Sequence, residues 1–285
     1  MTTRYLLFAI LISSTWGKSK RLPSSVKSLY RSIKSQERCQ RAYAADFHSS
    51  DGDNGDFVYC GDHLESLNIL YIRGSDHNLS NMDIDCDGDQ QAMTTAADNP
   101  CQSSNDTQSQ TSFADTIKGF NAGISDLNPH VHPYVVFGNE GTKPNWPTYD
   151  PRTQGIHPLS VMAIVCNRRL VYGIWGDVNG DDGQEAMVGE ASISLARACF
   201  GPSMTGNNGH EENDILYIGF PGAEAVVPPS AAWNASSYED FARIIEPIGD
   251  ALVKSRLGKT SKAMKKAPKH GLLLVALFVG VYLFL

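Results

Sequence analysis

VMAIVCNRRLVYGIWGDVNGDDG, at residues 161–183, is the stretch of sequence that most directly determines the fold. Its two apolar runs, VMAIVC and LVYGIWGD, are rich in β-branched and aromatic residues. They flank Asn167 and Arg168, and this pattern predicts a β-hairpin. A Gly-rich acidic loop follows. The sequence therefore predicts a strand that ends near Asp177, beside Trp175, at the mouth of a sheet.

Further short β-type runs lie on both sides of the hairpin, each bounded by Gly, Asn, Asp or Pro. They are LNILYIRG at 67–74, MDID at 82–85, HPYVVFGN at 132–139 and DILYIGF at 214–220. Helical patterns are fewer: SFADTIKGF at 112–120, ASISLARACF at 191–200 and SYEDFARIIEPIGDALV at 237–253. We expect Pro247 to kink or end the last helix. The fold class predicted is a β-rich α+β single domain. We expect a compact β-barrel, for which a double-psi topology is one option, or a sandwich, with peripheral helices.

The N-terminal part of the chain differs in character from the middle. Residues 1–17 have the order of a secretory signal peptide, with one Arg before a short apolar run and small residues. Residues 18–38 are basic and Ser-rich and form a predicted leader or pro-segment, in which Lys20 and Arg21 are a dibasic pair where trimming could occur. No repeat or linker divides the middle of the chain, so we predict one folded domain over residues 39–250.

The C-terminal part has a basic spacer at 251–270 and an apolar tail at 271–285. A helix of this tail would span roughly 22 Å, less than the roughly 30 Å of a bilayer's hydrocarbon core. Small residues, a polar spacer and an apolar terminus are the order of a GPI-attachment signal. Lumenal basic residues would also oppose the positive-inside rule for a permanent span. We expect GPI attachment, with a short membrane anchor as the alternative.

Cysteine usage and sequons agree with export. Six cysteines without a CxxC pair argue against zinc and thioredoxin-like sites and favour disulfides, for which 15 pairings exist. The cysteines are Cys39, Cys60, Cys86, Cys101, Cys166 and Cys199. Glycosylation sequons begin at Asn78, Asn105 and Asn234.

The middle of the chain is strongly acidic. Between Ala42 and Asp250, 30 Asp and Glu residues stand against 8 Lys and Arg residues, a formal charge of −22, whereas the whole chain carries −7. A domain with this charge repels nucleic acid and anionic lipid, and it attracts polycations and divalent cations. We therefore expect no nucleic-acid partner. Solubility alone is the other explanation of such a surface.

Two acids of different type are predicted at the ends of neighbouring elements. Asp177 ends the hairpin's second strand, and Glu190 follows thirteen residues later at the start of a predicted helix. Glycoside hydrolysis needs one protonated carboxyl and one ionised carboxylate that face one cleft. Nearby acids, Asp181 and Asp182 among them, would raise the pKa of one carboxyl by like-charge repulsion. Acid pairs at this spacing also occur as solvated surface residues, so the pattern needs a second signal.

A second acidic cluster, MDIDCDGD at 82–89, begins like an EF-hand calcium loop. The acids at the first, third and fifth loop positions are Asp83, Asp85 and Asp87. The twelfth position, which requires a bidentate Glu, is Thr94; in the similar loop that begins at Asp177 it is Val188. We therefore predict no metal site, because an acidic lining that binds cationic sugars accounts for both clusters.

Nine segments in order from about Cys39 to about Phe220 carry a family resemblance. They are FHSSDGD, YCGDH, MDIDCDGD, DTQSQTSF, GISDLNPHVHPYVVFGN, PLSVMAIVC, VYGIWGDVNGDDG, VGEASISLARACFG and GNNGHEENDILYIGF. They resemble the fungal chitosanases of glycoside hydrolase family 75. The resemblance implies a secreted enzyme that hydrolyses internal β-1,4 linkages of chitosan by inversion and without a cofactor. The essential acids of the WGD and VGEAS segments correspond to Asp177, as general base, and Glu190, as general acid.

Chitosan carries protonated amines in mildly acidic surroundings, so the resemblance and the charge agree. The candidates for amine recognition are Asp83, Asp85, Asp87, Asp89, Asp181 and Asp182. Trp175 is a candidate to stack on a sugar face, with a core position as the other interpretation. We expect a monomer that is secreted or held at the cell surface. The alternatives are a surface-anchored acidic protein that binds chitosan without cleaving it, and a calcium-stabilised adhesion domain.

Overall fold

The computed structural model describes residues 20–90, 99–102, 104 and 107–258. Its strands are β1 (Lys20–Arg21), β2 (Ala42–Phe47), β3 (Phe57–Cys60), β4 (Leu70–Arg73), β5 (Ser80–Asp85), β6 (Tyr134–Asn139), β7 (Val161–Cys166), β8 (Arg169–Asn179), β9 (Glu190–Ser192) and β10 (His210–Gly219). Its helices are α1 (Ser24–Lys34), α2 (Leu64–Leu67), α3 (Ala114–Gly119), α4 (Ile193–Phe200) and α5 (Tyr238–Leu252), with 3-10 turns η2 (Pro151–Gln154) and η3 (Ala223–Ala225) and a π-helical turn η4 (Val253–Leu257). Every run predicted as a strand overlaps one, so the β-rich α+β class is confirmed.

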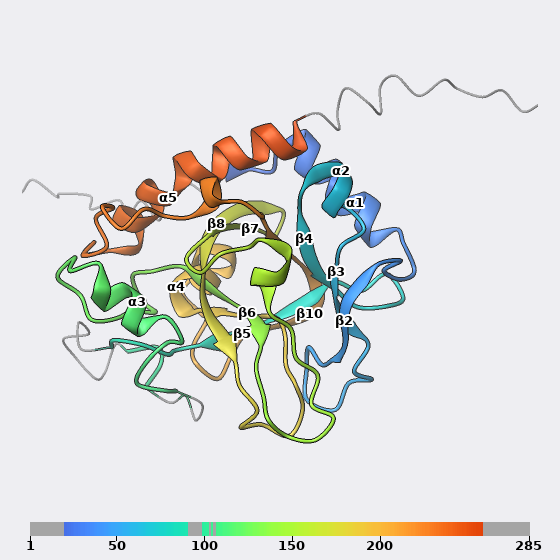
Figure 1. Ribbon diagram of the computed structural model, residues 1–285, viewed down its shortest axis with the longest axis horizontal. Coiled ribbons are helices and arrows are strands. Elements are labelled where there is room, and N and C mark those ends of the chain that lie inside the picture. Colours follow the sequence, from blue (N-terminus) through green and yellow to red (C-terminus); the bar gives the residue numbers. More distant parts are fainter. Residues whose placement is uncertain (1–19, 91–98, 103, 105–106, 259–285) are drawn as a thin grey trace, which may run out of the picture.

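Six strands pair edge to edge in a closed ring, which lies at the centre of Figure 1. From β8 the ring runs through β6, β9, β5, β10 and β7 and returns to β8. The pairs β6–β8 and β5–β9 are parallel and the others are antiparallel. The last residues of β10, beyond its pairing with β5, pair with β4, and the strands β4, β3 and β2 extend the sheet.

The hairpin of β7 and β8 is the regular part of the ring and confirms the prediction made for it. Val161 lies opposite Ile174, and Cys166 lies opposite Arg169. The connecting residues Asn167 and Arg168 have φ angles of 44° and 58°. Positive φ at both residues is what a two-residue type I′ turn requires, and its twist matches that of the strands.

Helix α5 covers one end of the ring and packs against β7 and β8 (Figure 1). Pro247 was expected to kink or end this helix; it does not end it, because the helix continues to Leu252. Its buried face is formed by Phe241, Ile245, Gly249 and Leu252. A Cβ at Gly249 would lie 2.5 Å from the Tyr172 ring, so the helix packs closely on β8. Burial of this face offsets the backbone hydrogen bond that Pro247 cannot donate.

The described fold begins before Cys39, which was the predicted start of the domain. Helix α1 buries three apolar side chains, those of Val26, Leu29 and Ile33. The guanidinium of Arg73, which is 0% exposed, donates hydrogen bonds to the carbonyl oxygens of Ile33 (3.2 Å) and Gln36 (2.8 Å). A buried charged group needs such partners. Part of the predicted leader is therefore packed into the domain.

All six cysteines form disulfides, as the sequence indicated. The pairs are Cys39–Cys60, Cys86–Cys101 and Cys166–Cys199. Each cysteine is joined to the cysteine nearest to it in the sequence, and the sequence had left this pairing open.

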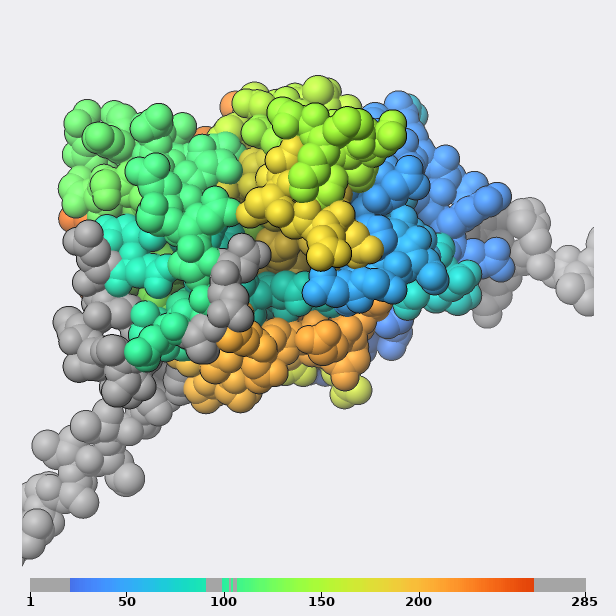
Figure 2. Space-filling model, turned by 90° about the horizontal axis from the view of Figure 1, so that it is seen from below, coloured from blue at the N-terminus to red at the C-terminus, as the bar shows by residue number. Residues whose placement is uncertain are grey.

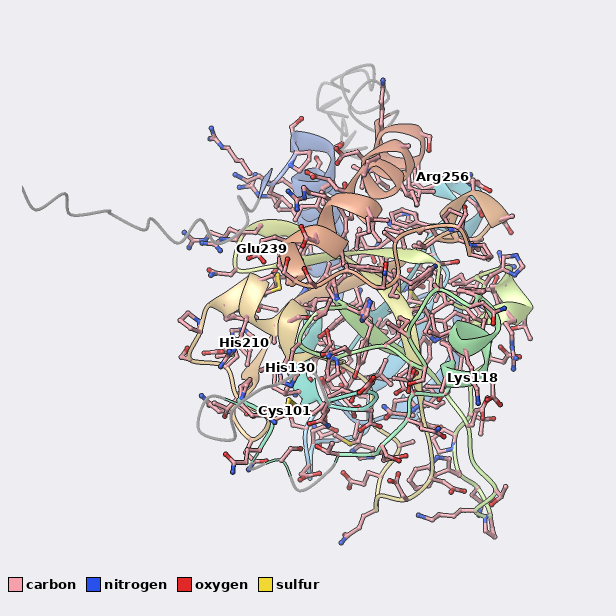
Figure 3. All side chains as sticks on the ribbon, turned by 90° about the vertical axis from the view of Figure 1, so that its left-hand side faces the viewer. Cys101, Lys118, His130, His210, Glu239 and Arg256 are labelled. Atoms are coloured by element: carbon pink, nitrogen blue, oxygen red, sulfur yellow. A yellow bond between two sulfur atoms is a disulfide. The ribbon has the colours of Figure 1, made fainter. Side chains whose placement is uncertain are left out.

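In Figure 3, Glu239 and Arg256 lie toward the end of the molecule covered by α5, and Cys101 lies toward the opposite end.

Several predicted segments lie outside the described residues: the signal peptide, the apolar tail, most of the basic spacer, Asn105 and Thr94. In the part of the chain that the structure describes, no helix has the length and apolar character needed to cross a membrane. The other two sequon residues, Asn78 and Asn234, are exposed.

Candidate active site

A cleft of about 1100 Å³ opens at the end of the ring opposite α5. Figure 2 views the molecule from this side, where segments distant in the sequence meet. The lining comes from residues 50–51, 83–85, 108–112, 177–182 and 206–209, together with Asp87, Glu140, Met187, Glu190 and Glu211 among others. Residues from five strands of the ring, β5, β6, β8, β9 and β10, reach it.

The cleft is strongly acidic. Its acidic lining residues are Asp51, Asp83, Asp85, Asp87, Glu140, Asp177, Asp181, Asp182, Glu190 and Glu211. None of the described residues that line it is Lys, Arg or His. The one predicted acid that lies elsewhere is Asp89, which lines a neighbouring depression of about 540 Å³ together with Asp126. Ten acidic residues of the domain thus line one cleft.

Asp177 lies on β8 and is only 4% exposed. Its Oδ1 accepts hydrogen bonds from the Ser112 backbone N–H (2.9 Å), the Ser112 hydroxyl (2.6 Å) and the Val178 N–H (2.8 Å). Its Oδ2 is buried and has no hydrogen-bond partner among the described residues. Burial raises the pKa of Asp177 to about 6, and the bonds from Ser112 and Val178 only partly oppose this. An acid of this kind changes charge in the mildly acidic range.

Two neighbours of Asp177 on β8 explain its placement. A Cβ at Gly176 would lie 2.5 Å from the Tyr134 Cβ, so glycine lets β8 approach β6 closely. Trp175 is 1% exposed, its ring contacts Phe113 edge to face, and its Nε1 donates to the Asp177 carbonyl oxygen at 2.9 Å. The proposed stacking of Trp175 on a sugar is therefore wrong, because no ligand can reach this buried ring.

Glu190 is the first residue of β9 and not the start of a helix, which corrects the prediction. It lies opposite Asp83 on the parallel strand β5, and Asn179 Nδ2 donates to its Oε1 at 3.3 Å. The preceding Gly189 has a φ of 99°, and a Cβ there would lie 2.3 Å from the Ser80 Oγ. Only glycine combines this backbone conformation with so close an approach to β5.

Strand β6 separates the two candidate acids. Val136 lies opposite Asp177 on β8, and the adjacent Val135 lies opposite Ala191 on β9. Asp177 and Glu190 are thus two strands apart, which corresponds to roughly 10 Å between their Cα atoms at about 4.8 Å per strand. Both line the same cleft, as the sequence predicted.

A cluster of three carboxyl groups lies beside Asp177. Asp85, Asp87 and Asp177 each have an oxygen within 4.8 Å of the others. Asp85 is 8% exposed, and its Oδ1 accepts from the Asp87 N–H (2.6 Å) and the Tyr134 hydroxyl (3.1 Å). Burial, followed by the charges of Asp177 and Asp87, raises the pKa of Asp85 well above its usual value. Such a group can share a proton or bind a cation, and the geometry suits either.

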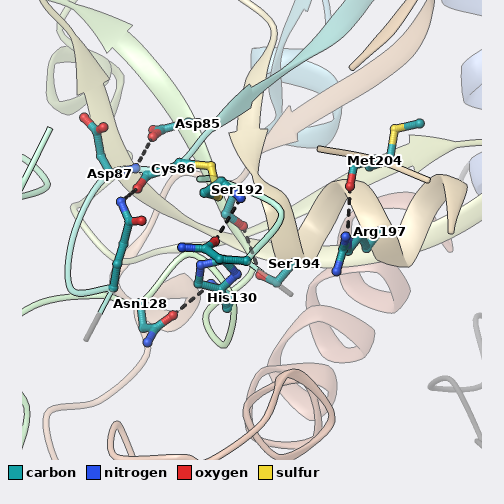
Figure 4. The surroundings of a disulfide bond; sticks show 12 residues. Asp85, Cys86, Asp87, Asn128, His130, Ser192, Ser194, Arg197 and Met204 are labelled. Atoms are coloured by element: carbon teal, nitrogen blue, oxygen red, sulfur yellow. Dashed lines mark hydrogen bonds between the residues drawn. A yellow bond between two sulfur atoms is a disulfide. The ribbon is translucent and has the colours of Figure 1, made fainter. Parts of the chain in front are cut away.

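The disulfide Cys86–Cys101 holds this cluster in place. Figure 4 shows Cys86 between Asp85 and Asp87 in the chain, with the bond from the Asp87 N–H to Asp85 drawn as a dashed line. Both cysteines are buried. The covalent link therefore fixes the backbone at the point where β5 ends and two acids enter the cleft.

The remaining predicted acids differ in their surroundings. Asp83 has its pKa raised to about 6, chiefly by burial. Asp181 is bound to another loop, because its Oδ2 accepts from the backbone N–H groups of Thr142 and Lys143, and these bonds lower its pKa. Gln108 Nε2 donates to Asp182 Oδ2 at 3.4 Å. The carboxylate of Asp181 thus connects two loops at the rim of the cleft.

The family model of the fungal chitosanases of glycosyl hydrolase group 75 matches residues 82–255. The chain belongs to this family. An endo-chitosanase of Aspergillus oryzae is 43% identical over 238 residues, which are 81% of this chain and 90% of that protein. An endo-chitosanase of Aspergillus fumigatus is 42% identical over 241 residues, 84% of this chain and 93% of that protein. An endo-chitosanase B of Aspergillus oryzae is 41% identical over 234 residues, 81% and 90% of the two chains.

In this member of the group 75 chitosanases, the structure adds two residues to the candidate site. The sequence did not predict either of them. Ser112 binds Asp177 from the loop before α3, and Tyr134 binds Asp85 from β6. Both stand in segments that carry the family resemblance, DTQSQTSF and HPYVVFGN. That resemblance was the available signal, since neither residue type at these positions indicates a site by itself.

Proposed function

We propose that this glycoside hydrolase is an endo-chitosanase that cleaves β-1,4 bonds between glucosamine units of chitosan. The observation that carries the proposal is the cleft lining, with ten acidic side chains and no basic one among its described residues. A cleft of one sign concentrates a polymer of the opposite sign. The relatives named endo-chitosanase support the same substrate.

The reaction we propose is an inverting hydrolysis by two carboxyl groups. Glu190, protonated, donates its proton to the glycosidic oxygen as the bond to the anomeric carbon breaks. Asp177, ionised, takes a proton from a water that attacks the anomeric carbon from the opposite face. Inverting enzymes leave room for this water with carboxyl groups about 6.5–9.5 Å apart. The two-strand separation of Asp177 and Glu190 supports this geometry.

Activity on chitosan should be lost at low pH. The base works when ionised, and the pKa of Asp177 is raised to about 6. We expect kcat to fall as the pH drops through this value, by about tenfold per unit well below the pKa, and to fall again on the alkaline side where the general acid Glu190 loses its proton. Acidification also charges more amines of chitosan, which should strengthen binding, so a fall in kcat reports on the enzyme. A kcat that stays constant from pH 7 to pH 4.5 would contradict Asp177 as the base.

The substrate can be tested with two polymers that share β-1,4 linkages and differ in charge. We expect new reducing ends from soluble chitosan and none from carboxymethylcellulose. Salt should raise KM on chitosan, because it screens the exposed charges of the cleft, and should leave kcat nearly constant. Binding of chitosan without cleavage by the wild-type chain would sink the proposal and favour a non-catalytic binding protein.

The finer points of fold and location are also proposals. We infer that the closed ring of strands is a compact barrel, because each strand in it has two neighbours. We propose that the protein acts outside the cell as a monomer, since its three disulfides are typical of proteins that mature in an oxidising compartment. Removal of the signal peptide and attachment through the C-terminal tail are proposed from the sequence alone.

A further inference from the structure

The carboxyl cluster beside Asp177 poses a problem of charge. Asp85 and Asp177 are nearly completely buried, and an oxygen of each lies within 4.8 Å of the other and of Asp87. No cationic side chain is present among the described residues that line the cleft. Like charges this close in a poorly solvated site cannot all be ionised, so one carboxyl of the cluster must keep its proton.

The hydrogen bonds indicate which carboxyl keeps the proton. Three hydrogen atoms point at Oδ1 of Asp177, and such bonds favour the ionised form. Asp87 is more exposed than the other two, and its Oδ1 accepts from the Gln108 N–H at 2.5 Å. Asp85 is buried and receives two bonds, one of them from the hydroxyl of Tyr134. Asp85 is therefore the least stabilised as an anion.

The same bonds indicate which oxygen carries the proton. Oδ1 of Asp85 already accepts two hydrogen atoms, from Asp87 and from Tyr134, so a proton on this residue belongs on Oδ2. Across the cluster, Oδ2 of Asp177 is buried without a hydrogen-bond partner among the described residues. A buried acceptor of this kind requires a donor. Oxygens of the two carboxyl groups lie within 4.8 Å of one another, a separation that a side-chain rotation or one bridging water would close.

We propose that Asp85, protonated on Oδ2, donates a hydrogen bond to Oδ2 of Asp177 and so keeps the base ionised and oriented. Asp85 is then a positioning residue, and its role rests on the base function proposed for Asp177. The titratable groups that face Asp85 are Asp87 from the loop after β5, Tyr134 from β6, Asp177 from β8 and Glu190 from β9. None of them is a cation.

Two substitutions at one position separate the proton from the charge. In Asp85→Asn the amide oxygen can accept from Asp87 and Tyr134, and the amide N–H can donate to Asp177 as the protonated carboxyl does. We expect kcat within about threefold of the wild type and an acidic limb of the kcat profile at an unchanged pH, because a donor is kept. Asp85→Ala removes the donor. Its kcat should fall by about 10- to 100-fold, and its acidic limb should move to higher pH.

Three results would overturn the proposal. A loss of kcat in Asp85→Asn as large as in Asp85→Ala would mean that the carboxylate itself is needed. An acidic limb that moves to lower pH in Asp85→Asn would mean that Asp85 is ionised in the wild type and repels charge on Asp177. Loss of wild-type activity in EDTA, with recovery in Ca²⁺, would mean that a cation and not a proton balances the cluster.

A measurement without substrate keeps this inference separate from the proposed function. In full-length protein labelled with ¹³C at the Asp carboxyl carbons, the NMR signal that disappears in Asp85→Asn should remain that of a protonated carboxyl at pH 6. A signal that titrates near pH 4 would refute the proposal even for an active enzyme. Asp76→Asn, an exposed site with a φ of 49° that Asn tolerates, is the matched control for loss of one Asp. Circular dichroism of each variant checks folding.

Discussion

Asp177→Asn and Glu190→Gln should each lower kcat on soluble chitosan by about 10²- to 10⁴-fold, the usual contribution of a general acid or base. Each substitution keeps the shape of the side chain and removes its proton chemistry. Asn at 177 can still accept from Ser112 and Val178 through its amide oxygen, so the fold should persist. Release of reducing ends measures kcat, and calorimetric titration with chitosan oligomers measures binding, which we expect to stay within a few-fold.

Glu211→Gln is the matched control for these variants, because it removes one negative charge from the same cleft. It should raise KM and change kcat by less than about twofold, since a lining charge of this kind contributes to attraction and not to proton transfer. If either active-site variant keeps more than a tenth of the wild-type kcat, that carboxyl is not the acid or base. A proton NMR spectrum of the first products should show the α-anomer, and β-products would rule out inversion.

A chain that begins at Cys39 should not fold, whereas a chain that begins at Leu22 should. Loss of α1 exposes the pocket that receives Val26, Leu29 and Ile33, and burial of each such side chain is worth about 1.5–3 kcal/mol. It also removes the acceptors of the buried Arg73 guanidinium, which costs about 1–3 kcal/mol or more. Together these losses are comparable with the whole stability of a typical domain, about 5–15 kcal/mol.

The comparison uses two truncations that differ only by α1 and the residues that follow it. Trimming after the dibasic pair at Lys20 and Arg21 leaves α1 intact and, of the described elements, removes only β1, which pairs with the beginning of β8. Soluble yield, the near-ultraviolet circular dichroism spectrum and the urea midpoint report on folding. A cooperative urea transition of the Cys39 chain with the midpoint of the Leu22 chain would show that α1 is dispensable and that a longer pro-segment can be removed.

The sequence predicted the strands well and their assembly less well. The local composition of runs such as VMAIVC predicts strands, and the two-residue turn at Asn167 and Arg168 predicts that the strands on either side of it pair as a hairpin. The parallel pairs that close the ring join residues far apart in sequence, and no local pattern encodes them. Strand β9 has only three residues and exists because Glu190 pairs with Asp83, so its sequence alone favoured the helix that follows. Helix α1 was missed because a basic, Ser-rich composition outweighed its apolar spacing.

The residues of the candidate site divide in the same way, into those that the local sequence predicts and those that depend on tertiary contacts. Asp177 and Glu190 were singled out because their segments resemble a family and because the sequence predicted both acids at the ends of neighbouring elements. Trp175 was misplaced, because the register of β8 against β6 shifts between Trp175 and Asp177, and simple alternation along the sequence does not show which of the two reaches the cleft. Ser112 and Tyr134 act through single hydrogen bonds from other elements. Such contacts depend on tertiary distance, which the order of residues does not reveal.

The disulfide between Cys86 and Cys101 makes the completion of the cleft depend on the oxidation of two thiols. It closes next to Asp85 and Asp87, so a covalent link holds the backbone that carries the acids beside the candidate base. In a reducing compartment the two thiols stay unpaired, and the end of β5 lacks this link. Completion of the cleft is therefore coupled to the redox state of the compartment in which the chain folds.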